Sequence, residues 1–271
     1  MTIRQLFTVL CMSPQPLMQN SRSLARQQRE QALLKLAQQI LRQDGFAGLT
    51  MDRLTAVSDV SKGTLYNHFS SKEDVLTALS VDSLQRLQQL FQLALSFSGH
   101  SRERALALHY AYQRFSAAEP TLFLCLLTAA TPGVMEKSSV QRLQRRQQLE
   151  TELLTSCQSV LSEALADGSL TLPAGTAVEE YAFINWAMAF GCNALFTPLR
   201  QLGLFAGLEA GQVNIHSISL LFDGMGWLPL TADWDYQASW QRINQMFSQR
   251  LATAGSDSFT HPMLSNAQEP A

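Results

Sequence analysis

The stretch VSKGTLYNHFSSKE, residues 60–73, decides the fold of the N-terminal part of this chain. Thr50 is placed to cap a short helix that runs through Val57, and residues 58–60 interrupt the helical pattern. Ser61 can then cap a third helix of about two turns. The region is therefore predicted to contain two short helices joined by a three-residue turn.

This arrangement, from Thr50 to Phe69, predicts a helix-turn-helix. Apolar side chains are expected to pack inward at Val57, Val60, Leu65 and Phe69. A helix-turn-helix presents the N-terminal end of its second helix to the major groove of DNA. The residues expected near or on that outer side are Lys62, Gly63, Thr64, Tyr66, Asn67 and His68.

The chemistry of these residues suits DNA. Lys62 can neutralise a phosphate, Thr64 can contact a base edge or a thymine methyl group, and Gly63 lets the backbone come close. Tyr66 and His68 offer hydrogen bonds without a permanent charge. A structural role for His68 and a core-covering role for Tyr66 remain open alternatives.

Charge supports the same interpretation once the N-terminal part is considered alone. The whole chain carries 20 Lys and Arg against 22 Asp and Glu, a net charge of -2. Residues 21–72 hold eight bases against four acids, a local charge of +4 that leaves -6 for the rest. A basic module on an acidic larger part suits an anionic polymer partner, although a solvated charged face would look the same.

Apolar residues recur at helical spacing through the chain, and clean alternation of period two is missing, so the fold class is predicted to be all-α. A first helix is expected over 22–44 with Gly45 as its stop, and a capping box of Ser70 and Glu73 opens a long helix toward Phe97. Further helices are expected at 101–118, 120–130, 138–167, 176–199, 210–224 and 234–254.

The expected organisation has four parts: a disordered leader over 1–21, a helix-turn-helix domain over 22–70, a helical effector-binding and dimerisation domain over 71–255, and a disordered tail over 256–271. The apolar run from Leu6 to Met12 is too short for a signal sequence and lacks a cleavage motif, which leaves Met18 as an alternative start.

Residues 181–199 form an uncharged run long enough to cross a membrane. Its polar residues and flanking charges do not support insertion, so a buried helix and no membrane partner are predicted. The chain has four cysteines, none of them with the spacing of metal ligands: Cys11, Cys125, Cys157 and Cys192. They are expected to be reduced, mostly buried thiols of a cytoplasmic protein. No metal and no cofactor are predicted.

Residues 33–79 resemble the DNA-binding domain of the TetR family of transcriptional repressors. The quoted stretch is close to the family signature V-S-K-G-T-L-Y-x-H-F-x-S-K-E, and Gly45-Phe46 matches the G-[YF] after the first helix. The resemblance implies a homodimer that binds a two-fold symmetric DNA operator and a variable C-terminal domain that binds an inducer. Among the family's positions, Thr55, Ser58 and Asp59 replace small residues; Asp59 is expected to tolerate a left-handed turn and Thr55 to tilt the helix pair.

With this resemblance, DNA contact is expected at Thr50, Ser61, Lys62, Gly63, Thr64, Tyr66, Asn67, His68 and Lys72. The family's cavity would have a mainly apolar lining and take an apolar, aromatic-type effector. Its expected residues are Phe91, Gln113, Phe115, Phe123, Phe183, Trp186, Phe190 and Asn193, with Asn185 as a further polar group. The dimer interface is expected near 176–199 and 210–224.

An enzyme is the first rival interpretation. The sequence contains no G-x-S-x-G, P-loop, H-E-x-x-H or dinucleotide fingerprint, so no catalytic residue is predicted. A constitutive architectural DNA binder or a protein-interaction module is the second rival, and it would need no ligand cavity. Repression is favoured over activation by the resemblance alone.

Overall fold

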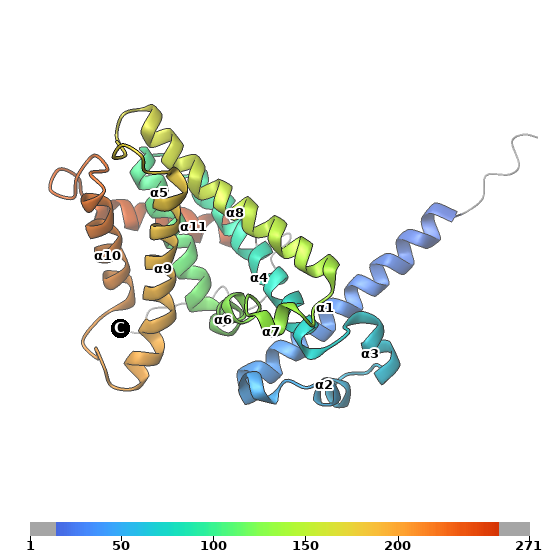
Figure 1. The fold of residues 1–271 in the computed structure, drawn as a ribbon. Helices are drawn as coiled ribbons and strands as arrows, with labels where there is room; N and C mark the ends of the chain where they lie inside the picture. Colours follow the sequence, from blue (N-terminus) through green and yellow to red (C-terminus); the bar gives the residue numbers. More distant parts are fainter. Residues whose placement is uncertain (1–14, 255–271) are drawn as a thin grey trace, which may run out of the picture. The chain divides into compact units, whose positions relative to one another are not determined.

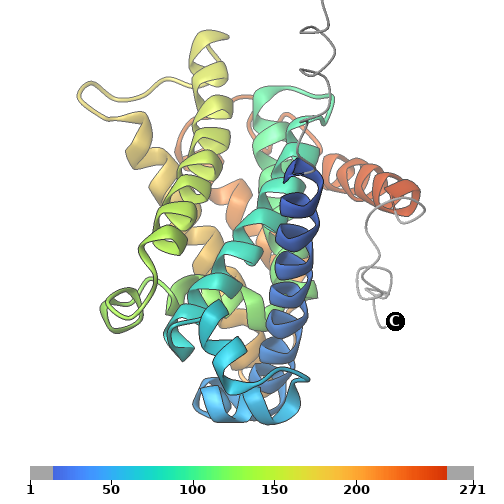
Figure 2. The same cartoon turned by 90° about the vertical axis from the view of Figure 1, so that its right-hand side faces the viewer.

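The computed structural model describes residues 15–254, and within that range the protein is built from helices without strands (Figures 1 and 2). The expectation of an all-α fold is confirmed. Residues 1–14 and 255–271, which include much of the expected leader and the expected tail, lie outside the described residues.

The described helices follow the chain in this order: α1 (Gln15–Gly48), α2 (Met51–Val57), α3 (Lys62–His68), α4 (Lys72–Leu95), α5 (Ser101–Ala118), α6 (Pro120–Thr128), α7 (Pro132–Met135), α8 (Val140–Ala166), α9 (Val178–Gln201), α10 (Ala210–Gly224) and α11 (Tyr236–Ala254). The short α7 is the one described helix that the periodicity did not predict. Four residues are too few to show a helical repeat.

The chain divides into two compact units on either side of residues 75 and 76. In the first unit α1 packs on α2 and α2 packs on α3. Its core is made of buried aliphatic and aromatic side chains: Leu33, Leu34, Ala37, Ile40, Leu41, Leu49, Leu54, Leu65 and Phe69. Val57, expected to face inward, is 43% exposed, because Leu54 is the α2 residue that enters this core.

The helix expected from Arg22 begins earlier, at Gln15, so residues 15–21 are helical and do not belong to a disordered leader. Gly45 has φ +68° and ψ -171°, which interrupts α1 near the expected stop. A left-handed conformation of this kind favours glycine because it has no Cβ. The last residues of α1 follow this kink.

The start of α4 is capped one residue later than predicted. The backbone N–H of Asp74 donates to Oγ of Ser71 at 3.0 Å, and the N–H of Ser70 donates to Oδ2 of Asp74 at 3.1 Å. Ser71 therefore caps α4, the carboxylate of Asp74 binds the N–H of the preceding Ser70, and the expected box of Ser70 and Glu73 is wrong. Glu73 and Asp74 both lie in the first turn, where acidic side chains stabilise a helix N-terminus.

In the second unit α5 is the central helix, since it packs against α6, α8, α9, α10 and α11. Most of its residues are buried. Pro120 opens α6 as expected, and Gly168, with φ +78°, follows the end of α8. Figure 1 shows α9 and α10 side by side on one flank of α5, in agreement with their contacts.

The uncharged run 181–199 forms most of α9, yet the expectation of a buried helix is wrong. Phe183 is 60% exposed, Trp186 49% and Leu195 58%. The α5, α8 and α10 helices pack against α9 without enclosing it, so an apolar face stays open in the protomer. None of the helices in residues 15–254 is both long and apolar enough to cross a membrane.

Candidate functional site

Two side-chain caps define the short helices of the helix-turn-helix. Oγ1 of Thr50 accepts a hydrogen bond from the backbone N–H of Arg53 at 3.1 Å, and Oγ of Ser61 accepts one from the N–H of Thr64 at 3.2 Å. Both caps were predicted. Each satisfies an N–H group that would otherwise lack a partner at a helix start, so the pair is ordered by local chemistry.

The turn between the two helices is built without a left-handed aspartate. Ser58 ends α2 in an extended conformation, with φ -106° and ψ 156°. Phe205 is the one non-glycine residue with positive φ in the described part of the chain, so the expectation for Asp59 is wrong. The hydroxyl of Thr55 donates to the carbonyl of Met51 at 2.8 Å, which satisfies this polar group within α2.

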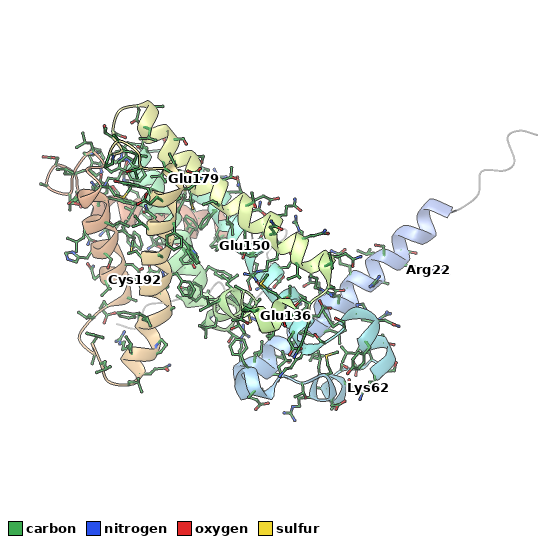
Figure 3. The ribbon with its side chains drawn as sticks, viewed as in Figure 1. Arg22, Lys62, Glu136, Glu150, Glu179 and Cys192 are labelled. Carbon is green, nitrogen blue, oxygen red and sulfur yellow. The ribbon has the colours of Figure 1, made fainter. Side chains whose placement is uncertain are left out.

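The outer face of α3 carries the residues expected there, with one exception. Lys62, Gly63, Tyr66 and Asn67 are exposed, Thr64 is half-buried, and Leu65 is fully buried beneath them. Lys72 is exposed at the start of α4. Lys62, labelled in Figure 3, lies on this surface.

His68 is the exception. Its side chain is 5% exposed, and its Nδ1 lies 3.2 Å from Oε2 of Glu30 on α1. The expectation that His68 lies on the outer side is therefore wrong. The ring holds the C-terminal end of α3 against α1, and the carbonyl of Asn67, which accepts a hydrogen bond from Arg26 at 3.3 Å, adds a second link to α1. His68 positions α3 through these contacts with α1.

Lys62 forms an exposed ion pair across the helix-turn-helix. Its Nζ lies 2.7 Å from Oδ1 of Asp52, and that hydrogen bond and charge raise the pKa of Lys62 above its usual value. Both side chains are largely exposed, at 61% and 81%, so the pair adds little to stability. Lys62 can consequently exchange Asp52 for another anion at small cost.

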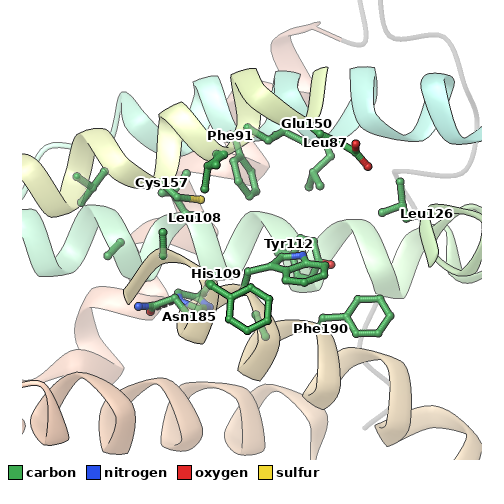
Figure 4. Close-up of a pocket in the computed structure, with 18 of the residues that line it drawn as sticks. Leu87, Phe91, Leu108, His109, Tyr112, Leu126, Glu150, Cys157, Asn185 and Phe190 are labelled. Carbon is green, nitrogen blue, oxygen red and sulfur yellow. Dashed lines mark hydrogen bonds between the residues drawn. The ribbon is translucent and has the colours of Figure 1, made fainter. Parts of the chain in front are cut away.

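The second unit contains a cavity of about 440 Å³, lined mainly by side chains from α4, α5, α8 and α9, with Leu126 and Leu127 of α6 at one side (Figure 4). Its wall is mainly apolar. Of the expected effector residues, the cavity wall includes Phe91, Phe183, Trp186 and Phe190, and it also includes Asn185.

The other expected effector residues lie outside this wall. Phe115 and Phe123 are 2% exposed and belong to the core, where Phe123 stacks on Phe190. Asn193 accepts a hydrogen bond from Ser116 at 2.9 Å. Gln113 is half-buried and does not line the cavity.

Apart from Asn185, sequence reasoning missed the polar groups of the cavity. His109 and Tyr112 reach it from α5, and Arg146, Glu150 and Cys157 reach it from α8. Ala105, Leu108, His109 and Tyr112 occupy helical spacing of three and four residues on one face of α5, whereas Gln113 and Phe115 lie off that face. Extending the α5 stripe from His109 would have identified Tyr112.

His109 is a neutral group in the cavity wall. Desolvation lowers its pKa from 6.5 to about 4, and the hydrogen bond with Asn185 opposes this shift only in part. The distance from Nε2 of His109 to Oδ1 of Asn185 is 3.3 Å. Because the depressed pKa lies well below 7, the cavity carries an uncharged imidazole at neutral pH.

This pKa predicts a loss of stability in acid. Between pH 6.5 and 4 the unfolded chain binds a proton on His109 and the folded protein does not, so the free energy of unfolding falls as the pH falls through this range. From pH 7.5 to 5 we expect a loss of up to about 2 kcal/mol from this group, since one pKa unit corresponds to about 1.4 kcal/mol.

Urea denaturation of the wild type and His109→Gln at the two pH values measures this loss. The variant should lose about 2 kcal/mol less than the wild type over this pH range. An equal pH dependence in the two proteins would rule out the role of His109.

The cysteines are free thiols in the described range. Burial raises the pKa of both Cys125 and Cys157 to about 12, so neither is a thiolate at neutral pH. Cys192 is also free, and Cys11 lies outside the described residues. Residues 15–254 hold no group of three or more His, Cys, Asp or Glu side chains arranged for a metal ion.

Comparison with known proteins finds a family match in the N-terminal part of the chain. Residues 33–79 match the family model for bacterial regulatory proteins of the tetR family. The chain is 30% identical over 115 residues to the HTH-type transcriptional repressor NemR of Escherichia coli strain K12 and equally to that of strain CFT073. The match covers 41% of this chain and 56% of each relative, so the chain spans about half the length of the curated relatives it matches.

Solved structures share the fold over most of their length. A Rhodococcus sp. RHA1 protein of unknown function aligns with a TM-score of 0.59 and 22% identity, covering 73% of this chain and 95% of the other. The TetR family regulator PfmR from Thermus thermophilus gives 0.54 and 18%, covering 70% and 96%. The ketosteroid regulator KstR2 of Mycobacterium tuberculosis gives 0.54 and 17%, covering 73% and 94%.

Proposed function

We propose that this chain, which is a TetR-family protein through its N-terminal helix-turn-helix domain, is a transcriptional repressor that a small mainly apolar effector releases from DNA. The observation that carries this proposal is the capped α2–α3 pair, whose exposed face holds Lys62, Thr64, Tyr66 and Asn67 above the buried Leu65. These side chains are the ones that a recognition helix offers to a major groove. A cytoplasmic location and the lack of a catalytic role accompany the proposal.

Each proposed DNA residue has a distinct task. Lys62 and Lys72 bind phosphates, and Thr64, Tyr66 and Asn67 read base edges. Thr50 and Ser61 order the two short helices through their caps. His68 acts through position, by holding α3 against α1.

Gly63 supports the close approach of DNA. A Cβ atom built on Gly63 would meet a single neighbouring atom, Oγ of Ser61, at 4.0 Å. Packing inside the protein therefore does not require glycine here, although glycine weakens a helix relative to alanine by about 1 kcal/mol. A partner backbone that comes close to α3 explains the missing side chain.

A homodimer through α9 and α10 is the second part of the proposal. Ile184, Ala187, Gly191 and Leu195 follow one another on the open side of α9, and Leu220 is 61% exposed on the neighbouring α10. An apolar face of this extent resembles an obligate interface cut in half. Pairing two copies would also place two α3 helices on a two-fold symmetric operator.

The cavity separates this proposal from the architectural alternative. A constitutive DNA binder needs no internal space, whereas a volume of about 440 Å³ lies within the range of small-molecule sites, roughly 300 to 1,000 Å³. Its aromatic and aliphatic wall favours an apolar effector. Binding of an effector should lower the DNA affinity of the proposed repressor, whereas an architectural DNA binder would show no such effect.

DNA binding is tested with the phosphate contacts. Lys62→Ala and Lys72→Ala should each weaken binding to all duplexes and lower the slope of log affinity against log salt by about 0.9, because each contact releases counterions. Thr64→Ala should instead change base preference. Fluorescence anisotropy on duplexes selected from a random pool measures both.

Lys35→Ala is the matched control, because Lys35 is exposed on α1 and lies nine residues from Arg26, about half a turn around the helix from the side facing α3. It should keep the wild-type salt slope. Purified wild-type protein that shows no salt-sensitive binding to any pool member would reject the DNA-binding proposal.

A further inference from the structure

Tyr112 brings into the cavity wall a hydroxyl group whose hydrogen has no acceptor among the described residues. Its side chain is 4% exposed and lies among the cavity residues of Figure 4. No described residue accepts a hydrogen bond from this hydroxyl, and the indole N–H of Trp186 beside it can only donate. Buried hydroxyl groups are almost always paired, so this one is available to a group that enters the cavity.

The Tyr112 hydroxyl is a neutral donor. Burial raises the pKa of Tyr112, and a hydrogen bond from the Trp186 side chain to the phenol oxygen opposes that rise only in part. The phenol thus keeps its proton at neutral pH. Its ring contacts Phe123 edge to face at 5.4 Å between ring centroids, which fixes the ring without using the hydroxyl.

The other polar groups near Tyr112 are already engaged with one another. Nδ2 of Asn185 donates to the carbonyl of Tyr181 at 2.8 Å, which orients the amide and leaves its Oδ1 facing His109. Because Oδ1 can only accept, Nε2 of the neutral His109 carries the hydrogen between them. This pair supplies no positive charge to the cavity.

The charged residues of the wall disfavour an anion. Arg146 donates to Oε1 of Glu150 at 2.6 Å and to the carbonyl of Leu126 at 3.2 Å. Its Nε–H has no acceptor among the described residues, but the carboxylate of Glu150 compensates its charge. Glu150 and Glu179 add two carboxylates to the lining against this one guanidinium. A negatively charged ligand would lose its hydration without gaining a free cation.

We propose that the effector is a neutral, mainly apolar molecule with a carbonyl, ester or ether oxygen, and that this oxygen accepts a hydrogen bond from Tyr112. This inference rests on the proposed effector role of the cavity and assigns its specificity to one atom. A phenylalanine at this position would pack on Phe123 equally well and would leave no hydroxyl hydrogen without an acceptor. The hydroxyl therefore serves recognition, and the aliphatic and aromatic wall binds the rest of the ligand.

Two isosteric compounds test the assignment: 2-acetylnaphthalene, which carries a ketone oxygen, and 2-isopropenylnaphthalene, which has a CH₂ group in its place. Equilibrium dialysis against the full-length protein gives the ratio of their affinities. Tyr112→Phe should lower this ketone-to-hydrocarbon ratio about tenfold, through weaker ketone binding alone, since a hydrogen bond in an apolar site contributes about this factor. The anion 2-naphthoate should bind more weakly than the ketone.

Tyr110→Phe is the matched control. Tyr110 lies on the same helix, but its hydroxyl donates to Oδ1 of Asn244 on α11 at 2.6 Å, outside the cavity. This variant should keep the wild-type affinity ratio and lose thermal stability, because it leaves Asn244 without its donor. Tyr112→Phe should show the opposite pattern, with an unchanged or raised Tm and a reduced ratio.

Three results would overturn the inference: no binding of either compound to the wild type, an affinity ratio unchanged by Tyr112→Phe, or tighter binding of 2-naphthoate than of the ketone. None of these bears on operator binding, which is measured separately by anisotropy. If the ketone instead bound through Tyr112 without changing DNA affinity, the ligand assignment would stand and the effector role in the proposed function would fail.

Discussion

Leu195→Asp is expected to convert the protein from a dimer to a monomer and to reduce operator affinity at least a hundredfold. Leu195 is 58% exposed toward the C-terminal end of the open apolar side of α9. At a two-fold interface the same substitution appears in both subunits, so two unpaired carboxylates would be buried together. Burying an unpaired charge costs several kcal/mol, and about 1.4 kcal/mol changes an equilibrium constant tenfold.

The loss of DNA binding follows from the loss of pairing. A dimer places two recognition helices on half-sites one helical turn apart, whereas a monomer binds with one α3 helix. Multi-angle light scattering at micromolar concentration measures the assembly state, and anisotropy on the selected operator measures affinity. The two changes should occur together in Leu195→Asp and, to a smaller extent, in Ala187→Glu.

Val140→Asp controls for the addition of a charge to an exposed apolar position. Val140 is 67% exposed at the start of α8 and belongs to neither α9 nor α10, and an acidic residue in a first helical turn is favourable. This variant should stay dimeric and bind DNA normally. A dimeric Leu195→Asp with full operator affinity would show that another surface joins the subunits.

Local chemistry explains why the helix-turn-helix was predictable from sequence. The caps at Thr50 and Ser61 involve residues three apart, and the kink at Gly45 needs one residue type. In each case the residue that determines a helix end lies within one helical turn of that end. The shift of the α4 cap from Ser70 to Ser71 shows the limit, because neighbouring serines offer the same hydroxyl.

The errors arise where a contact joins distant parts of the chain. His68 belongs to the motif and was expected to face DNA, but its partner Glu30 lies 38 residues away. The spacing within α3 alone does not reveal this pairing. Likewise, the exposure of α9 depends on how much of it α5, α8 and α10 cover, which composition does not specify.

In the cavity, too, the sequence predicted some features correctly and others wrongly. Phe183, Trp186 and Phe190 were predicted as apolar ligand-facing residues, and they line it. Phe115 and Phe123 have the same chemistry and lie in the core instead. Whether an aromatic residue fills space or borders it depends on the packing of four helices, so the sequence supplied the type of wall without the identity of its residues.

The second large effect is expected at Arg102, whose side chain is 1% exposed at the start of α5. Its guanidinium donates to Oδ1 of Asp223 at 2.7 Å, to the carbonyl of Pro229 at 2.8 Å and to Oγ1 of Thr231 at 3.0 Å. It also donates to the carbonyl of Trp227 and lies 4.4 Å from the ring centroid of Tyr236. One side chain thus joins α5, the end of α10, the following loop and the start of α11.

Arg102→Leu should lower the free energy of unfolding by about 3 to 5 kcal/mol, because it leaves buried carbonyl groups and the Asp223 carboxylate without their donor. Arg102→Lys should lose a smaller part, since an ammonium group keeps the charge but cannot span the same set of acceptors. Urea denaturation measures both losses. Arg200→Leu, which breaks an exposed pair with Glu209, should cost less than about 1 kcal/mol.

The Arg102 network also connects stability to ligand binding. Trp227, whose carbonyl Arg102 holds, is part of the cavity wall, so a loosened loop should weaken the binding of 2-acetylnaphthalene and 2-isopropenylnaphthalene by the same factor. Tyr112→Phe, by contrast, should affect the ketone alone. A selective loss of ketone binding in Arg102→Leu, or a loss of stability no larger than that of Arg200→Leu, would contradict the structural role assigned to Arg102.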